Sequence, residues 1–306
     1  MDGVAGVDTV SYADSNAAVN VNLAVTTAQT GGYAQGDTLF NIENIIGSAY
    51  DDALAGSSVA NKIDGGAGAD TVSYSNSTAA VTVNLGVTTA QAGGYAAGDI
   101  LVSIENIIGT PLNDTLTGST ANNIIIGGAG ADKMDGAAGI DTVSYAGSNA
   151  AVNVNLAVTT AQVGGHAAGD TIFNIENIIG SSYNDTLKGS SIANIINGGS
   201  GNDTMTGGTG ADVFKFSAIT DSGKASGARD IITDFVRGTD KIDLADYAGT
   251  FTFKGTGALG GSVHGVNYAQ VSGNTIIGID ADGNGTLDMQ IQLTGLHALT
   301  SSDFLL

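Results

Sequence analysis

This 306-residue sequence has no cysteine, no tryptophan and only one proline. Without cysteine, neither a disulfide framework nor a thiolate metal site can form. Positive charge is also scarce, since nine Lys and Arg stand against 30 Asp and Glu and leave a formal net charge of −21. Such acidity disfavours nucleic acid and anionic membranes as partners. No apolar run approaches the length of a membrane span, so we also expect no membrane insertion.

Glycine, in contrast, is abundant, with 47 residues beside a hydrophobic content of 42%. This is too much glycine for helices, and the β-branched content is too high for a disordered linker. Nothing at the N-terminus resembles a signal peptide. The composition therefore favours a repetitive β-architecture.

A nine-residue repeat organises the chain, and it is clearest over residues 109–144, which read GTPLNDTLT, GSTANNIII, GGAGADKMD and GAAGIDTVS. Position 1 is always Gly, position 6 is Asp or Asn, and position 8 is apolar. Six residues of this kind form a turn that can adopt positive φ, and the other three form a short strand with one inward hydrophobe.

Two such units make one coil of a flattened parallel helix, so the turns of successive coils align along each edge. Aligned turns bring aspartate carboxylates and turn carbonyls together. These hard oxygen ligands are the type that calcium prefers. The spacing therefore predicts calcium sites along both edges.

A longer repeat contains these units. Residues 10–48 return at 72–110 and again at 143–181, and the two offsets, 62 and 71, differ by one nonapeptide. A stacked repeat tolerates insertion by whole units because each unit contacts only its neighbours. We predict two domains: 1–215, with long repeats at about 10–72, 72–143 and 143–215, and 216–306. Residues 3–11 already form a nonapeptide, so we expect the chain to be a piece of a longer protein.

Between the nonapeptides, residues 18–25 alternate apolar and polar side chains and predict a strand. Residues 37–46 have apolar residues at spacing three. A helix is one interpretation there, but a β-coil is favoured because a helix would interrupt the stacking. Near the C-terminus, residues 273–295 predict two strands about a turn with the sequence DADGNGTLD.

The units beginning at Gly65, Gly127, Gly198 and Gly207 match GGxGxDxUx and resemble the calcium-binding repeat of RTX proteins. Residues 211–247 resemble the segment that closes the roll in serralysin-type proteases. The resemblance implies an all-β fold, a right-handed parallel β-roll or β-helix solenoid with a C-terminal β-rich cap. It also implies Ca²⁺ as the cofactor, held between units n and n+2.

This implied pairing joins Asp52 to Asp70, Asp114 to Asp132 and Asp185 to Asp203 on one edge. On the other edge, Asn123 pairs with Asp141 and Asn194 with Asp212, and we expect these sites to be weaker because a neutral amide replaces a carboxylate. The alternative is that Asp and Asn only close turns by bonding their own backbone. The implied ligands, carboxylates and turn glycines, are Asp52, Gly65, Gly68, Asp70, Asp114, Gly127, Gly130, Asp132, Gly136, Gly139, Asp141, Asp185, Gly198, Gly201, Asp203, Gly207, Gly210 and Asp212.

A second candidate metal loop resembles the first half of an EF-hand and contains Asp280, Asp282, Asn284 and Asp288. The acid expected at its twelfth position is Ile291, and no helices are predicted beside it. A β-turn closed by Asx hydrogen bonds is an equal alternative.

No catalytic or cofactor-binding motif accompanies these repeats. His166, His264 and His297 are isolated from any HExxH pattern, and no Gly-x-Ser-x-Gly elbow occurs. We therefore predict that this chain is not itself an enzyme.

The resemblance implies a calcium-binding module of a secreted or cell-surface bacterial protein that folds on calcium after type I secretion. A structural or adhesive role is one possibility, with self-association or polysaccharide as the contact. The other is the non-catalytic C-terminal module of a secreted protease, lipase or alginate epimerase. RTX proteins are exported through an uncleaved C-terminal address, and Asp303, Phe304, Leu305 and Leu306 fit the serralysin-type ending.

Overall fold

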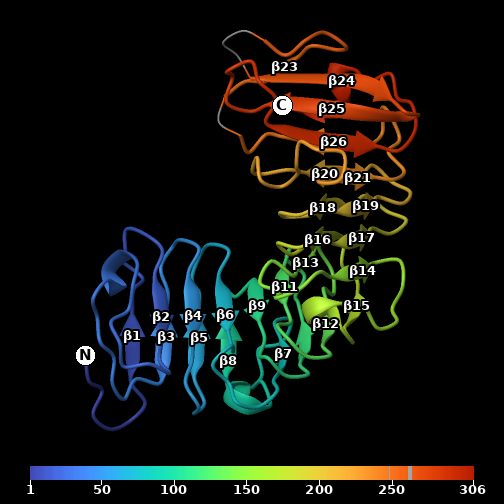
Figure 1. The fold of residues 1–306 in the computed structure, drawn as a ribbon. Helices are drawn as coiled ribbons and strands as arrows, with labels where there is room; N and C mark the ends of the chain where they lie inside the picture. Colours follow the sequence, from blue (N-terminus) through green and yellow to red (C-terminus); the bar gives the residue numbers. More distant parts are fainter. Residues whose placement is uncertain (248, 261–263) are drawn as a thin grey trace. The chain divides into compact units, whose positions relative to one another are not determined.

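The structure is a computed structural model that describes residues 1–247, 249–260 and 264–306. Over these ranges its regular elements are β-strands and four short 3-10 helices, and most strands pair in parallel (Figure 1). The predicted all-β parallel roll is confirmed. The chain packs as two compact units, 1–143 with 169–175 and 144–168 with 176–306.

Three rows of three-residue strands build the first unit. The first row is β1 (Thr9–Ser11), β3 (Asn44–Ile46), β5 (Lys62–Asp64) and β8 (Ile100–Val102). The second is β7 (Thr82–Asn84), β10 (Thr115–Thr117), β12 (Lys133–Asp135) and β15 (Thr171–Phe173). The third is β2 (Asn20–Asn22), β4 (Ala53–Ala55), β6 (Thr71–Ser73), β9 (Asn106–Ile108), β11 (Ile124–Ile126) and β13 (Thr142–Ser144).

The middle residue of each strand points inward, because alternate residues of a strand face opposite sides. The register of the parallel pairs therefore places the middle residues of neighbouring strands on top of one another. In the second row, Val83 pairs with Leu116, which pairs with Met134, and all three are fully buried. Burying each such side chain contributes about 1.5–3 kcal/mol. These columns form the core, and position 8 of the nonapeptide supplies most of their members.

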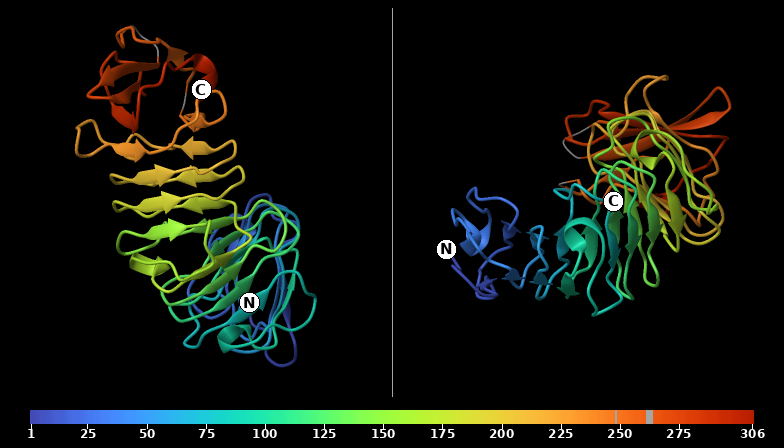
Figure 2. Two further views of the ribbon diagram at one scale, coloured as in Figure 1. Left: turned by 90° about the vertical axis from the view of Figure 1, so that its right-hand side faces the viewer. Right: turned by 90° about the horizontal axis from the view of Figure 1, so that it is seen from below.

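The second unit continues the same construction with two rows (Figure 2). One row is β16 (Asn177–Ile179), β18 (Ile195–Asn197), β20 (Val213–Lys215), β22 (Lys241–Asp243) and β27 (Phe304–Leu305). The other begins with β14 (Asn153–Asn155), β17 (Thr186–Lys188), β19 (Thr204–Thr206) and β21 (Asp230–Ile232).

The second row then becomes antiparallel. β26 (Met289–Leu293) pairs in parallel with β21 and antiparallel with β25 (Asn274–Asp280). β25 pairs antiparallel with β24 (Gly265–Val271), and β23 (Thr252–Phe253) completes the row. The predicted pair of strands about the DADGNGTLD turn corresponds to β25 and β26. The seven-residue strand β24 was not predicted.

Each long repeat adds a loop with a 3-10 helix, η1 (Gly32–Ala34), η2 (Gly94–Ala96) and η3 (Gly165–Ala167); the fourth, η4 (Ser301–Asp303), precedes β27. In the three long repeats a buried glutamine closes the loop: Gln29, Gln91 and Gln162. The N–H of Asn22 donates to Gln29 Oε1 at 2.7 Å, and Gln29 Nε2 donates back to the Asn22 carbonyl. Residues 37–46 hold no helix and end in β3, as the β-coil interpretation predicted.

Candidate metal centre

The four turns that match GGxGxD in full, 65–70, 127–132, 198–203 and 207–212, are called here the strict turns. Their first glycine leaves room for the aspartate of the same turn. A Cβ at Gly127 would lie 2.2 Å from Asp132 Oδ2, closer than real Cβ atoms approach. The second glycine has positive φ, +102° at Gly128, where a Cβ would also meet the Thr110 carbonyl oxygen at 2.2 Å.

The glycine at position 4 allows the turn to pack on the backbone of the preceding coil. Gly130 has a φ of +123°, and a Cβ there would lie 2.7 Å from the Leu112 carbonyl group. The glycines predicted as ligands at position 4 all have positive φ: Gly68, Gly130, Gly139, Gly201 and Gly210.

The glycines predicted as ligands at position 1 all have an aspartate Oδ2 within 2.6 Å of the position that a Cβ would take: Gly65, Gly127, Gly136, Gly198 and Gly207.

Along each edge the aspartates form a hydrogen-bonded ladder. Asp132 Oδ1 accepts the N–H of Asp114, 18 residues earlier, at 2.8 Å. The structure therefore brings together the pairs expected from the sequence. The same bond joins Asp52 to Asp70, Asn123 to Asp141, Asp185 to Asp203 and Asn194 to Asp212.

The second carboxylate oxygen of the position-6 aspartate is unsatisfied in all four strict turns. In Asp70, Asp132, Asp203 and Asp212, Oδ2 is buried and has no hydrogen-bond partner, and each of these residues is at most 1% exposed. Burying an ionised carboxylate without a compensating charge or hydrogen bond costs roughly several kcal/mol of folding free energy. Oδ2 of Asp8 and of Asp230 is in the same situation.

Burial raises the pKa of these carboxyl groups. The pKa of Asp132 rises to about 7 through burial, with a further contribution from the charges of Asp170 and Asp114. Burial and the neighbouring charge of Asp230 raise the pKa of Asp203 to about 9. Burial likewise raises the pKa of Asp70 and of Asp212 to about 6. The protein alone therefore does not stabilise the ionised form of these groups.

The first turn of each stack, 47–52, 109–114 and 180–185, is closed by a hydroxyl residue at position 2. Asp114 Oδ2 accepts the N–H of Thr110 at 2.5 Å, and Oδ1 accepts the Thr110 hydroxyl at 3.0 Å and the N–H of Val81 at 2.8 Å. Ser48 and Ser181 bond Asp52 and Asp185 in the same way. Both oxygens of these three aspartates thus have partners within the chain.

The second turn of each stack, 56–61, 118–123 and 189–194, has asparagine at position 6. Asn123 Oδ1 accepts the N–H of Ser119 at 2.7 Å, and Nδ2 donates to the backbone carbonyl of Glu105 at 2.5 Å. Asn61 and Asn194 bond Glu43 and Glu176 in the same manner. All three asparagines are at most 3% exposed.

The segments between the nonapeptide stacks, 12–46, 74–108 and 145–179, are called here the inserts. They also contribute carboxylates that the nonapeptide period did not predict. Asp70 donates its N–H to Glu105 Oε2, and Asn61 donates its N–H to Asp99 Oδ1. Asp99 also accepts the hydroxyl of Tyr74 at 3.0 Å. Asp170 continues the ladder for Asp132. Asp230 and Asp240, which follow the last stack, continue it for Asp203 and Asp212. A signal was present in the sequence, because Asp37, Asp99 and Asp170 follow Gly at equivalent places in the three long repeats.

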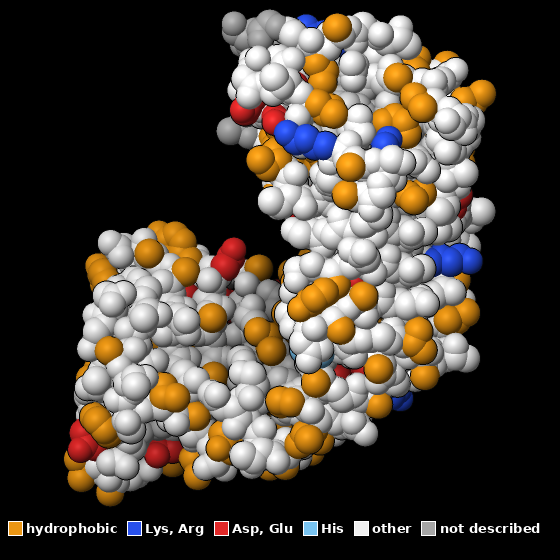
Figure 3. Space-filling view, viewed as in Figure 1, with side chains coloured by type: hydrophobic (Ala, Val, Ile, Leu, Met, Phe, Trp, Pro, Cys, Tyr) orange, Lys and Arg blue, Asp and Glu red, His pale blue; other side chains and the backbone are white. Residues whose placement is uncertain are grey.

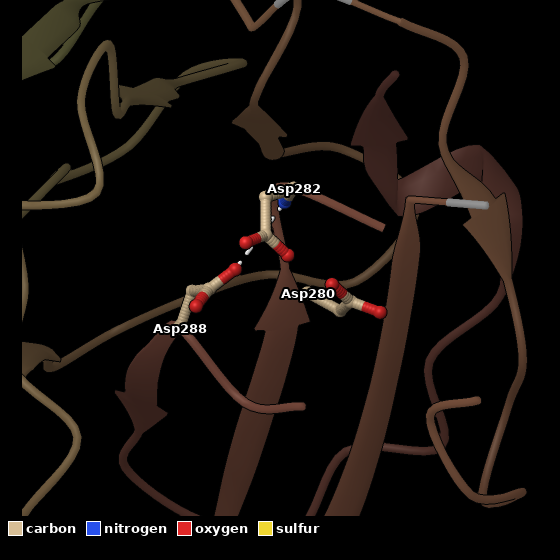
Figure 4. A group of neighbouring side chains, drawn as sticks. All are labelled: Asp280, Asp282 and Asp288. Carbon is tan, nitrogen blue, oxygen red and sulfur yellow. Dashed lines mark hydrogen bonds between the residues drawn. The ribbon is translucent and has the colours of Figure 1, made fainter. Parts of the chain in front are cut away.

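In the loop between β25 and β26, oxygens of Asp280, Asp282 and Asp288 lie within 4.8 Å of one another. Figure 4 shows the carboxylate of Asp288 pointing toward the backbone N–H of Asp282, which donates to Asp288 Oδ2 at 3.3 Å. Asp280 accepts the N–H groups of Gly283 and Gly285 at 2.9 and 2.8 Å. Asn284 donates its N–H to Asp282. These bonds are those of the Asx-closed β-turn.

Few acidic side chains are visible on the face shown in Figure 3, in keeping with the burial of the ladder.

Among the described residues, no helix has the length and apolarity that crossing a membrane requires. His264 Nδ1 lies 2.5 Å from the Ala281 carbonyl oxygen, and His297 Nε2 lies 3.0 Å from that of Thr294.

The strict turns fit calcium. Their partnerless oxygens are hard anionic ligands. A backbone carbonyl lies near one of them: a Cβ at Gly65 would meet the Ser103 carbonyl oxygen at 2.2 Å as well as Asp70 Oδ2 at 2.5 Å. A divalent cation would compensate the buried charge that no hydrogen bond satisfies. The residues that would hold it are the carboxylates of Asp70, Asp132, Asp203 and Asp212.

Two protein families match this chain. The family described as "Peptidase M10 serralysin C terminal" matches residues 132–306, and the "RTX calcium-binding nonapeptide repeat (4 copies)" matches residues 43–76 and 108–143. These matches confirm the predicted resemblance and calcium as the cofactor. Together they account for residues 43–76 and 108–306 as repeat and C-terminal domain.

Two curated relatives are similar to part of the chain. The metalloprotease AprA of Pseudomonas entomophila (strain L48) is 39% identical over 181 residues, covering 52% of this chain and 36% of the relative. The metallopeptidase AprA of Pseudomonas marginalis is 38% identical over 178 residues, with the same coverage of 52% and 36%. The chain thus spans about a third of the length of these relatives.

Among solved structures, the AlgE6R3 subunit of the mannuronan C5-epimerase from Azotobacter vinelandii is similar at 24% identity with a TM-score of 0.27. The match covers 63% of this chain and 78% of that subunit.

Proposed function

We propose that this chain, which belongs to the peptidase M10 serralysin C-terminal domain family, is the non-catalytic, calcium-folded C-terminal part of an exported metalloprotease. The similarity to two AprA proteases supports this parent class over a structural or adhesive protein. The catalytic domain of the parent would lie outside this chain. Outside the cell, where calcium is abundant, the roll would fold.

One observation carries the calcium proposal: the partnerless, buried Oδ2 atoms of the strict turns. Without an ion, the ladder brings buried carboxylates into neighbouring coils, and ordering a glycine-rich chain costs entropy. An ion that binds only the folded coils stabilises them by mass action. We assign the ions to Asp70, Asp132, Asp203 and Asp212, and by the same spacing to Asp141. Asp52, Asp114 and Asp185, whose oxygens already have partners, instead position their turns.

The test is to record circular dichroism and hydrodynamic radius of the chain in chelator and in calcium at about millimolar concentration, the range of extracellular modules. We expect a largely disordered chain in chelator and a compact β-rich one in calcium. Magnesium is the control, because it requires near-ideal octahedral geometry and dehydrates reluctantly. An unchanged spectrum between chelator and calcium would contradict the proposal.

We further propose that the C-terminal residues serve type I export before they serve the fold. In the folded chain Asp303 is fully buried and accepts N–H groups of Gly238 and Thr300 at 2.9 and 2.7 Å. Phe304 and Leu305 pair with β22. A segment so docked is not available to an exporter, so export would precede calcium-driven folding.

Deleting Asp303 to Leu306 separates the two roles. We expect both export from a host with a type I exporter and the calcium-induced stability of the purified chain to fall. Normal export of the deleted chain would contradict the address, whatever its stability. Substituting Asp303→Asn, which keeps an acceptor but removes the charge, is the milder control.

A further inference from the structure

The second turns raise the question of why asparagine, and not aspartate, recurs at position 6. Asn61, Asn123 and Asn194 occur at the same place in all three stacks. In the strict turns, Oδ1 at this place accepts an N–H from the preceding coil, as Asp132 does from Asp114. In the second turns the preceding coil belongs to an insert, and it presents a backbone carbonyl there instead. For Asn123 this is the carbonyl of Glu105, at 2.5 Å from Nδ2.

A second asparagine, Asn106 in the insert, leaves the Glu105 carbonyl free of a backbone N–H from the second turn. The backbone N–H that follows the ladder residue normally donates to the carbonyl of the preceding coil, as Lys133 does to Asp114 at 2.9 Å. In the second turn, Ile124 instead donates its N–H to the side chain of Asn106 at 2.8 Å. In the other two stacks, the side chain of Asn44 likewise accepts the N–H of Lys62, and the side chain of Asn177 accepts the N–H of Ile195.

The asparagine NH₂ group therefore lies between two oxygens from different parts of the chain. Asn123 Nδ2 is 2.5 Å from the Glu105 carbonyl oxygen and 3.4 Å from Ser119 Oγ. The corresponding distances are 2.7 and 3.4 Å for Asn61, and 2.6 and 3.3 Å for Asn194. An ionised carboxylate there would add a third oxygen facing the other two, an arrangement that a bound cation would compensate.

We propose that the side-chain amides of Asn61, Asn123 and Asn194 take the place of a bound cation and join each second turn to the insert before it without calcium. This assignment rests on the proposed calcium function and refines it. The NH₂ group, a hydrogen-bond donor, bridges two oxygens across neighbouring coils as an ion would. Each second turn is then an ion-independent junction at the start of its edge.

The substitution Asn123→Asp tests the proposal, because it replaces the donor by a carboxylate of nearly the same shape. The matched control is Asn122→Asp, one residue earlier in the same turn. Asn122 is exposed, and its Oδ1 accepts the N–H of Ile140 at 2.9 Å, a bond that aspartate retains. Both variants change the charge equally, so a difference between them reports the position of the carboxylate.

The readouts are the number of calcium ions per chain, by native mass spectrometry, and the calcium concentration at the folding midpoint. We expect Asn123→Asp to bind one ion more than the parent and to fold at a calcium concentration several-fold higher, because folding now requires a further ion. Asn122→Asp should keep the parental ion number. Asn194→Asp, in the second unit, repeats the test in case Asn123→Asp does not fold.

An unchanged ion number in a folded Asn123→Asp or Asn194→Asp variant would overturn the proposal. Failure of both variants to fold at any calcium concentration would overturn it as well, because the position would then not accept a cation. A parent chain that binds no calcium would contradict the proposed function instead, so the two failures are distinguishable.

Discussion

The strict turns and the second turns both bury the side chain at position 6, but they satisfy its polar atoms in opposite ways. In the strict turn 127–132, the carboxylate of Asp132 keeps a buried oxygen without a partner. In the second turn 118–123, both polar atoms of the Asn123 amide, Oδ1 and Nδ2, are hydrogen-bonded. The difference teaches that calcium dependence is set turn by turn, by whether the chain itself supplies the groups that satisfy position 6.

The largest expected effect comes from removing a strict carboxylate and comparing it with a first-turn carboxylate. Asp132→Ala should lose one calcium ion and raise the calcium midpoint about tenfold, equivalent to ~1.4 kcal/mol. Asp114→Ala should keep the ion number and lower stability instead, since the N–H groups of Val81 and Thr110 lose their acceptor, at a cost of about 1–3 kcal/mol for each. Calorimetric calcium titration gives the ion number, and equal ion losses in the two variants would contradict the distinction.

A pH titration in chelator sharpens the comparison without any substitution. The folded-state pKa is about 7 for Asp132 and about 9 for Asp203, against an ordinary value of 3.8. The folded state thus binds these protons more tightly than the unfolded chain does, and this difference stabilises the fold. The stabilisation is complete below the ordinary pKa of 3.8 and is lost as the pH rises through the folded-state pKa values. We expect the β-signal of the calcium-free chain to grow on acidification from about pH 9 to about pH 5. No gain over that interval would show that these carboxylates do not control folding.

The turn glycines give a smaller effect. Gly127→Ala places a methyl group against Asp132 Oδ2, and such overpacking costs about 1–3 kcal/mol. Gly147→Ala is the control, because nothing lies within 4 Å of its Cβ position, and we expect a change within about 0.5 kcal/mol. Denaturant unfolding in saturating calcium measures both, and similar stabilities would contradict the packing account.

The smallest effect is expected in the loop between β25 and β26. Asp282→Ala removes hydrogen bonds to Asn284 at an exposed position, so it should cost at most about 1 kcal/mol and leave the number of bound calcium ions unchanged. Loss of one ion, seen by native mass spectrometry, would favour the EF-hand-like interpretation of this loop.

The sequence predicted the parts of this fold that follow a fixed period. Position 8 gives core residues such as Leu116 and Met134, because the eighth residue of each nonapeptide faces inward whatever its neighbours are. The ladder between Asp114 and Asp132 follows from the same period. The family resemblance added calcium, which the match to the RTX repeat confirms.

Contacts that cross an insert could not be predicted in this way. Asp132 donates its N–H to Asp170, 38 residues later, and Asp203 donates to Asp230, 27 residues later. Neither separation equals the 18-residue coil. The role of Asn123 was equally inaccessible, because an amide is favoured there only if the preceding coil presents the Glu105 carbonyl, and the sequence gives no direct sign of that backbone orientation.

The most direct test of this difference between turns is an anomalous difference map from crystals of the chain grown in calcium. It should show ions coordinated by the carboxylates of Asp70, Asp132, Asp203 and Asp212, and none coordinated by the side chains of Asn61, Asn123 or Asn194. Calcium bound to any of those asparagine side chains, or strict turns that hold no ion, would contradict the account.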